Sequence, residues 1–175
     1  MTIHGDHPFI PPESERDPIR RLRGRLGGAV SLWTAGQGTD RVGLTVSSLL
    51  ISPGEPGHVL GLIDPESELA DALRADEVVV VQFLRYPQRQ LADAFAGQFP
   101  APGGAFRLGE EFGGWIDTDW GPLLAGASSW LGARTTGASP DTVGWSQLFD
   151  CVIEHIQLGD DNDALEHRRG RYRRP

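Results

Sequence analysis

Apolar and polar positions divide the chain into short strands and short helices. Two strand-like runs, AVSLWT and RVGLTVSSLLI, flank the Gly-containing turn AGQGTD, a pattern typical of a β-hairpin. Further strands are predicted at HVLGLID, EVVVVQFL, PLLAGASSWLGART and WSQLFDCVIEHIQL. The sequence therefore predicts roughly six or seven strands, which together with the first hairpin favours a closed β-barrel over a doubly wound sheet.

Three short segments have helical spacing. Asp17-Pro18 supplies an N-cap and a proline at the first helical position, and apolar residues recur every three or four positions until Gly27-Gly28. SELADALRAD, which begins at Ser67, and QRQLADAFAG, which ends at Gly97, predict two more helices. The barrel is therefore expected to carry short peripheral helices.

The remaining segments predict irregular structure at the two ends and in the middle. Residues 1–16 are rich in proline and predict an extended arm, and PAPGGAFRLGEEFGGW predicts a loop. The basic end HRRGRYRRP is either a solvated tail or an arm that meets an anionic ligand or a neighbouring subunit. We expect one domain over residues 17–175, because 175 residues suffice for one well-buried core and are few for two.

Composition excludes several classes of protein. The net charge of −8 argues against a general nucleic-acid binder. No apolar stretch approaches the roughly 20 residues that span a bilayer, and the start lacks a signal-peptide pattern, so we expect no membrane contact and a cytoplasmic location. Cys151 is the only cysteine and the five histidines are scattered, so we expect no metal site. All 16 cationic Lys/Arg positions are arginine, which excludes a lysine Schiff base.

Hydroxyl groups interrupt the second strand-like run. Thr45, Ser47 and Ser48 stand where a core strand would more often carry Val or Ile. They either point to solvent from one face of a strand or form a polar cradle for a ligand, because adjacent hydroxyls and free N–H groups can hold a phosphate or the edge of a heterocycle.

Several segments, in order, resemble the flavin reductase-like family. They are GGAVSLWTAG, GLTVSSLLIS, LIDPES, the QFL…QRQLADAFAG block, GPLLAGASSWL and ALEHRRGRYRR. The resemblance covers roughly Leu26 to Tyr172 and implies a mainly β fold, an FMN-binding split β-barrel of the Greek-key type. It also implies FMN as the cofactor, with FAD as an alternative, and NADH or NADPH as the hydride donor.

The resemblance also implies which residues contact the flavin. In such proteins the Thr-x-Ser-Ser segment lies along the isoalloxazine edge and ribityl chain. Carried over to this chain, the cofactor-binding positions are Thr34, Thr45, Val46, Ser47, Ser48, Ser67 and Gln82. Ser67 could hold phosphate at the start of its helix or only cap that helix. Gln82 stands where the family usually has Asn.

One stretch departs from the family pattern. Many of these reductases carry Gly-Asp-His near the nicotinamide, and here the stretch is Gly144-Trp145-Ser146. Trp145 and Ser146 are therefore the candidate nicotinamide contacts. Trp145 could stack on the nicotinamide or adenine ring, or it could fill the pocket and block it. No catalytic residue is assigned, because the flavin itself carries the hydride chemistry.

The leading hypothesis is an NAD(P)H-dependent flavin reductase that forms a homodimer, with a monooxygenase as a potential recipient of reduced flavin. Two alternatives remain. One is a flavin-binding protein without reductase turnover, and the other is a deazaflavin-dependent oxidoreductase on a related barrel.

Overall fold

The computed structural model describes residues 17–75 and 78–175. The predicted arm at residues 1–16 lies outside these ranges. The helices are α1 (Pro18–Leu26), α2 (Glu68–Arg74) and α3 (Arg89–Phe95), with 3₁₀ segments η2 (Gly38–Asp40), η3 (Tyr86–Gln88) and η4 (Ala105–Phe112). The strands are β1 (Gly28–Ala29), β2 (Ser31–Ala35), β3 (Val42–Val46), β4 (Leu49–Ser52), β5 (His58–Ile63), β6 (Val78–Phe83), β7 (Trp115–Thr118), β8 (Gly121–Leu124), β9 (Trp130–Thr135), β10 (Asp141–Val143), β11 (Ser146–Gln157), β12 (Glu166–Arg168) and β13 (Arg171–Arg173).

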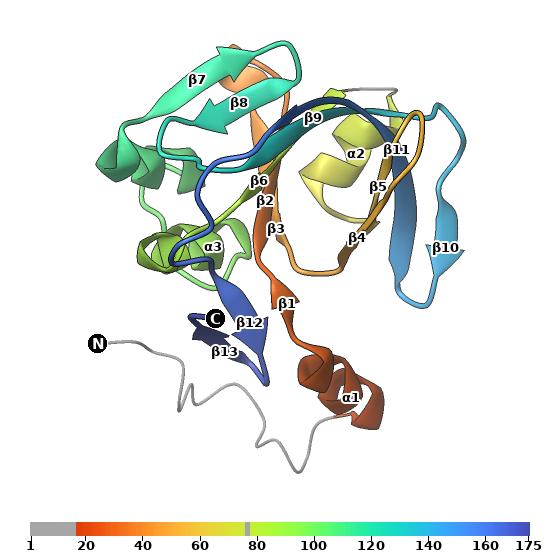
Figure 1. Ribbon diagram of the computed structural model, residues 1–175, viewed down its shortest axis with the longest axis horizontal. Helices are drawn as coiled ribbons and strands as arrows, with labels where there is room; N and C mark the ends of the chain where they lie inside the picture. Colours follow the sequence, from red (N-terminus) through yellow and green to blue (C-terminus); the bar gives the residue numbers. More distant parts are fainter. Residues whose placement is uncertain (1–16, 76–77) are drawn as a thin grey trace.

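A curled antiparallel sheet forms the body of the protein (Figure 1). Its strand order is β3-β2-β6-β9-β11-β5-β4, and β10 pairs with β11. The first two strands are the predicted hairpin, joined in register from Ser31 opposite Val46 to Ala35 opposite Val42. The predicted mainly β fold with short peripheral helices is therefore confirmed.

Helices cover both faces of strand β2, whose five residues are all buried. Successive side chains of a strand point to opposite faces. Trp33 joins one core with Leu69 and Leu73 of α2, whereas Leu32 joins another with Leu91 of α3. Because both faces are covered, the strand sequence SLWTA lacks the polar alternation of a half-exposed strand.

The indole of Trp33 lies directly on the backbone of β5. A Cβ atom added to Gly61 would stand 2.6 Å from the far edge of that ring. The indole N–H donates to the Ser31 hydroxyl at 3.0 Å, and that hydroxyl donates to the Val46 carbonyl at 2.6 Å. One buried ring therefore connects β2, β3 and β5 across the interior.

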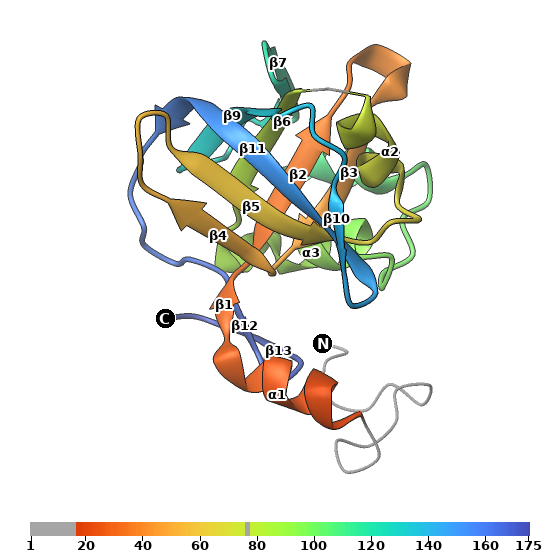
Figure 2. The ribbon, with the colours of Figure 1, turned by 90° about the vertical axis from the view of Figure 1, so that its right-hand side faces the viewer.

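The first and last described segments, residues 17–29 and 164–175, meet below the curled sheet. Strands β1, β12 and β13 form a separate three-stranded sheet, and α1 lies beside it (Figure 2). Tyr172 of β13 donates a hydrogen bond to the buried carboxylate of Asp93 on α3. The C-terminal segment is therefore a packed hairpin rather than a solvated tail.

Three sequence-based boundaries were wrong. RVGLTVSSLLI is two strands, because the chain leaves β3 at Ser47 and begins β4 at Leu49. PLLAGASSWLGART is likewise two strands, β8 and β9, separated at residues 125–129. The middle region predicted as a loop contains η4 and the first residue of β7, Trp115, which pairs with β8 in a hairpin. The sequence did not indicate these elements because the many glycines of this region hide any helical or strand periodicity.

We predict that Gly61→Ala destabilises the protein by about 1–3 kcal/mol, because the added methyl must displace a fixed indole edge. Urea unfolding monitored by circular dichroism measures this change. Gly57→Ala is the matched control, since a Cβ there would meet the Ser52 carbonyl at an ordinary 3.5 Å. Trp33→Phe removes the contacting ring edge, so in a double-mutant cycle the cost of Gly61→Ala should shrink in that background. Equal effects of the two glycine substitutions would contradict the proposed contact.

Candidate functional site

The link between β3 and β4 carries the serine doublet of the predicted flavin site. β3 and β4 are the outer strands of the curled sheet, so Ser47-Ser48 bridges its two edges. The Ser48 carbonyl accepts from the Leu62 N–H at 2.9 Å, which fixes the link to β5. Within the described residues neither serine hydroxyl has a hydrogen-bond partner, and Ser47 is exposed. These hydroxyls are therefore available to an external polar group.

The two residues before the link are used by the protein itself. The Thr45 hydroxyl donates to the Ala92 carbonyl of α3 at 2.7 Å. Val46 is 3% exposed, and its carbonyl accepts from Ser31. Thr45 and Val46 thus hold the end of β3 against α3 and β2, which places Ser47 and Ser48.

Two other predicted positions lie inside the core. The Thr34 hydroxyl donates to the Pro122 carbonyl at 2.6 Å and accepts from the Gln82 amide at 3.3 Å. The Gln82 carbonyl oxygen accepts from the Leu124 N–H at 2.9 Å. Both side chains are fully buried. Their polar groups connect β8 to β2 and β6, and such a satisfied network rigidifies a core.

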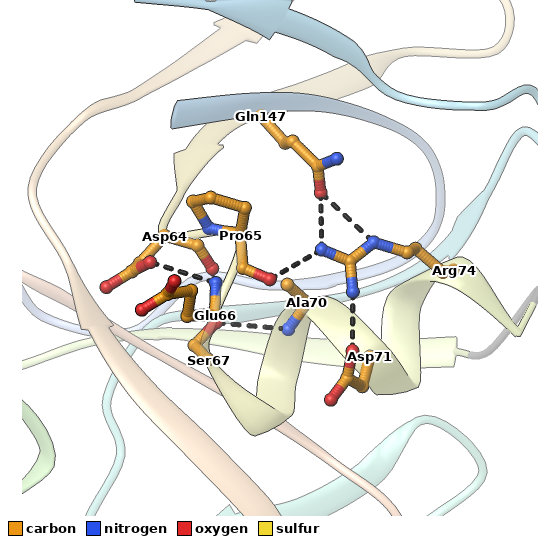
Figure 3. Close-up of polar contacts among 8 residues, drawn as sticks. All are labelled: Asp64, Pro65, Glu66, Ser67, Ala70, Asp71, Arg74 and Gln147. Carbon is orange, nitrogen blue, oxygen red and sulfur yellow. Dashed lines mark hydrogen bonds and ion pairs between the residues drawn. The ribbon is translucent and has the colours of Figure 1, made fainter. Parts of the chain in front are cut away.

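Ser67 caps α2. Its hydroxyl accepts from the Ala70 N–H at 3.2 Å and donates to the Asp64 carbonyl at 2.7 Å. Figure 3 shows that Arg74, the last residue of α2, joins this turn to β11. Its guanidinium donates to the Gln147 amide oxygen at 2.7 and 3.1 Å, to the Pro65 carbonyl at 2.6 Å, and to Asp71.

Trp145 and Ser146 lie at the tip of the β10–β11 hairpin. Gly144 takes the left-handed conformation that the tight turn requires, with φ 59°. Trp145 is 78% exposed, and the guanidinium carbon of Arg20 on α1 stands 5.6 Å from its ring centroid. Ser146 begins β11 opposite Val143. The Trp145 ring is therefore largely exposed to solvent beside α1.

The structure brings three of the predicted positions, Ser48, Ser67 and Ser146, together around the end of β5. Ser48 bonds Leu62 near that end, Ser67 closes the turn that follows, and Arg74 joins that turn to Gln147 beside Ser146. Leu62 pairs with Leu148, one residue beyond Gln147. Thr34 and Gln82 lie apart from this group, within the buried network around β8. That any of these residues contacts a ligand stays a prediction.

A cavity of about 280 Å³ lies elsewhere, beside η3 and η4, and the sequence analysis did not anticipate it. It is lined by Arg85, Pro87, Gln88, Phe112 and Gly126. Gln88 is 4% exposed, and its amide oxygen accepts from the Arg85 N–H at 2.8 Å. Arg85 and Gln88 stand three residues apart. In the sequence this spacing resembles only the beginning of the helix that follows, so it gave no sign of a cavity.

The titratable groups offer little acid–base chemistry at the end of β5. Burial, and secondarily the charge of Asp150, raises the pKa of the Cys151 thiol to about 12, so it stays protonated. Burial and the carboxylate of Asp93 raise the pKa of Tyr172. Hydrogen bonds from Trp120 and Arg134 lower the pKa of Glu154, which lies on the far part of β11. Residues 17–75 and 78–175 contain no cluster of His, Cys, Asp and Glu suited to a metal ion.

In the same ranges, no helix is both long enough and apolar enough to cross a membrane.

Comparisons with known proteins converge on one family. The profile of the flavin reductase like domain matches residues 23–175. The FMN reductase (NADH) RutF of Ancylobacter novellus is 27% identical over 162 residues, which cover 92% of this chain and 86% of that protein.

Two solved structures share the fold. The Streptomyces globisporus NADH:FAD oxidoreductase SgcE6 superimposes with a TM-score of 0.77 at 22% identity, over 95% of this chain and 96% of that one. BorF, the flavin reductase component of a bacterial two-component tryptophan halogenase, gives a TM-score of 0.73 at 22% identity, over 89% and 97%.

Proposed function

Because the chain belongs to the flavin reductase-like domain family, we propose that it is an FMN reductase that takes hydride from NADH. The observation that carries this proposal is the match of residues 23–175 to the family, extended by a curated FMN reductase (NADH) that aligns with 92% of the chain. The activity class is an oxidoreductase with a flavin and a nicotinamide nucleotide as its reactants.

The residues around the β3–β4 link fit a flavin. A flavin is a flat apolar ring system with polar atoms along one edge, and it requires a few placed donors beside apolar surface. Ser47 and Ser48 offer hydroxyls that no described residue occupies, and β4 beside them exposes Leu50. When bound, the flavin supplies the hydride acceptor.

We assign different roles to the predicted cofactor positions. Ser47 and Ser48 hydrogen-bond the flavin directly. Thr45 and Val46 hold the end of β3, and the Thr34–Gln82 pair keeps β2 and β6 rigid behind it. Ser67 fixes the turn after β5 through its cap, so its contribution to the site is the position of that turn.

The role of Trp145 distinguishes a reductase that turns over NADH from a protein that only binds flavin. Its exposed ring can stack on the nicotinamide or adenine of the hydride donor, and Arg20 steadies the tip that carries it. The same ring could instead fill the nicotinamide position, which would leave a flavin-binding protein without reductase turnover. This alternative follows from the replacement of the family's Asp-His by Trp145-Ser146.

We further propose that the reduced flavin leaves for an oxygenating partner enzyme in the cytoplasm. One structural neighbour is the reductase component of a two-component halogenase, which supports such a division of labour. A diffusible reduced flavin needs no covalent link between the two enzymes.

The activity itself is tested by NADH oxidation in the presence of added FMN. We expect steady turnover, and Trp145→Ala should raise the KM for NADH roughly 5- to 150-fold, because one base–aromatic stack contributes about 1–3 kcal/mol. Trp145→Phe, which keeps an aromatic face, should stay close to the parent. Faster turnover in Trp145→Ala would show that the ring blocks the site, and FMN binding without any NADH oxidation in parent or variants would establish the carrier function.

We predict that Ser47→Ala/Ser48→Ala weakens FMN binding by roughly one to two orders of magnitude, since each lost hydrogen bond is worth about 0.5–1.5 kcal/mol. Quenching of flavin fluorescence measures the Kd. The matched control is Ser52→Ala, an exposed hydroxyl at the other end of β4. Stability without flavin should change little, because neither serine hydroxyl has a hydrogen-bond partner among the described residues, and the main-chain bond of Ser48 to Leu62 is kept in the variant. An unchanged Kd would transfer the contact to the main chain.

The assembly proposed for this protein is a homodimer. The apolar side chains of α1 are largely exposed: the exposed fractions of Ile19, Leu22 and Leu26 are 75%, 63% and 79%. A neighbouring copy that covered this stripe would remove a large apolar surface from water. Light scattering at micromolar concentration should therefore give twice the mass of the chain, and Leu22→Glu/Leu26→Glu should shift it toward one chain. A parent protein that stays monomeric would contradict the proposal.

A further inference from the structure

Positive charge is concentrated in one small part of the protein. We define the basic lobe as α1 with its flanks, residues 17–28, and the C-terminal hairpin with its flanks, residues 164–175. Nine of the 16 arginines fall here against only two acids, Asp17 and Glu166, which gives a formal charge of +7. Since the whole chain carries −8, the remainder carries −15. The protein is therefore strongly polarised.

The two halves of the basic lobe pack on each other. The Arg169 N–H donates to the Gly24 carbonyl at 2.8 Å, and the Arg168 side chain lies against Gly27. Tyr172 anchors the hairpin to α3 through Asp93. Both ribbon views show α1 beside β12 and β13 (Figures 1 and 2). Arginines distant in sequence are thus held in one place by ordered structure.

Among the described residues, few carboxylates pair with these arginines. Within the described ranges only Arg174 of the nine pairs with a carboxylate, that of Asp163 at 3.1 Å. Arg20 contacts an aromatic ring instead. The remaining arginines include Arg23, Arg171 and Arg173, whose side chains are exposed. Unpaired cations fixed on one surface produce a local positive potential.

The basic lobe borders the candidate site on two sides. A Cβ added to Gly28 would stand 3.6 Å from the Ser47 carbonyl, so the end of the lobe touches the β3–β4 link. On the other side, the guanidinium of Arg20 lies over Trp145. The serine hydroxyls and the exposed indole therefore both lie next to positive charge.

Every reactant of the proposed reaction is an anion. FMN carries a phosphate monoester, and NADH carries a diphosphate. A body of charge −15 repels such molecules, whereas a positive surface beside a site attracts them and raises association rates 10- to 1,000-fold. We propose that the basic lobe is an electrostatic capture surface that draws the phosphate groups of the flavin nucleotide and the nicotinamide dinucleotide toward the site. This inference rests on the proposed function.

Riboflavin provides the discriminating probe, because it carries the flavin ring and ribityl chain of FMN without the phosphate. Stopped-flow flavin fluorescence gives the association rate constant of each ligand. At low ionic strength FMN should associate faster than riboflavin, and the FMN rate constant should fall at least 5-fold as salt shortens the Debye length from about 30 Å to about 3 Å. The riboflavin rate constant should change less than about 2-fold.

A charge-neutralising variant tests the location of the effect. Arg23→Gln/Arg171→Gln/Arg173→Gln removes three charges from the basic lobe and should slow FMN association roughly 3- to 10-fold at low salt, with little change for riboflavin. The control, Thr39→Glu/Arg107→Gln/Ser139→Glu, lowers the net charge by the same three at exposed positions outside the lobe. It should slow FMN association much less than the first variant does. Circular dichroism verifies that each variant is folded.

The outcomes separate the two proposals. If neither FMN nor riboflavin binds the parent protein, the proposed function fails and the capture surface fails with it. If both flavins bind but share the same salt dependence, or if the two triple variants slow FMN equally, only the capture surface is overturned. The same comparison with NADH, read from the salt dependence of kcat/KM, extends the test to the hydride donor.

Discussion

Close approach between an indole ring and a glycine backbone sets the spacing of this barrel. Trp33 can cross the interior to reach β5 only because Gly61 has no side chain. The contact recurs at Gly109 with Trp115 and at Gly132 with Trp120, so η4 and β9 also accept indoles where a Cβ would stand. With interiors packed as densely as organic crystals, such rings leave little room for adjustment. The positions of β3, β5 and their connections, and therefore the serine link, depend on this packing.

The predicted polar residues fall into two groups: those whose polar groups bond within the protein and those whose hydroxyls stay open to a ligand. The hydroxyls of Thr34 and Thr45 and the amide of Gln82 are consumed by hydrogen bonds inside the protein. The hydroxyls of Ser47 and Ser48 are left open on the link that joins the two sheet edges. An enzyme of this kind needs little acid–base chemistry from its side chains, because hydride transfer depends on the alignment of two rings. The hydrogen-bonded core residues keep β2, β3 and β6 rigid, and the β3–β4 link in front of them stays open. This arrangement can hold one ring in a fixed position.

Local pattern predicted the strong elements and missed those that depend on distant contacts. The Asp17 cap, the buried run of β6 and the first hairpin follow from sequence because each has a nearby signal. The break at Ser47 does not, since the chain bends there to reach β5 across the sheet. Likewise, the C-terminal hairpin is held by Asp93 and Leu165, which no periodicity in HRRGRYRRP could indicate. The resemblance named Thr34 and Gln82, but only the structure shows that they bond each other.

The single buried cysteine has a consequence for durability. Reduced flavin passes electrons to dioxygen, and the peroxide that results attacks exposed thiolates and thioethers. Cys151 is fully buried and protonated, and the only methionine is Met1. The folded body over residues 17–75 and 78–175 therefore presents no sulfur atom to oxidants. When reduced flavin meets dioxygen near this protein, the folded body therefore has no exposed thiol to oxidise and no route from the native state to disulfide-linked aggregates.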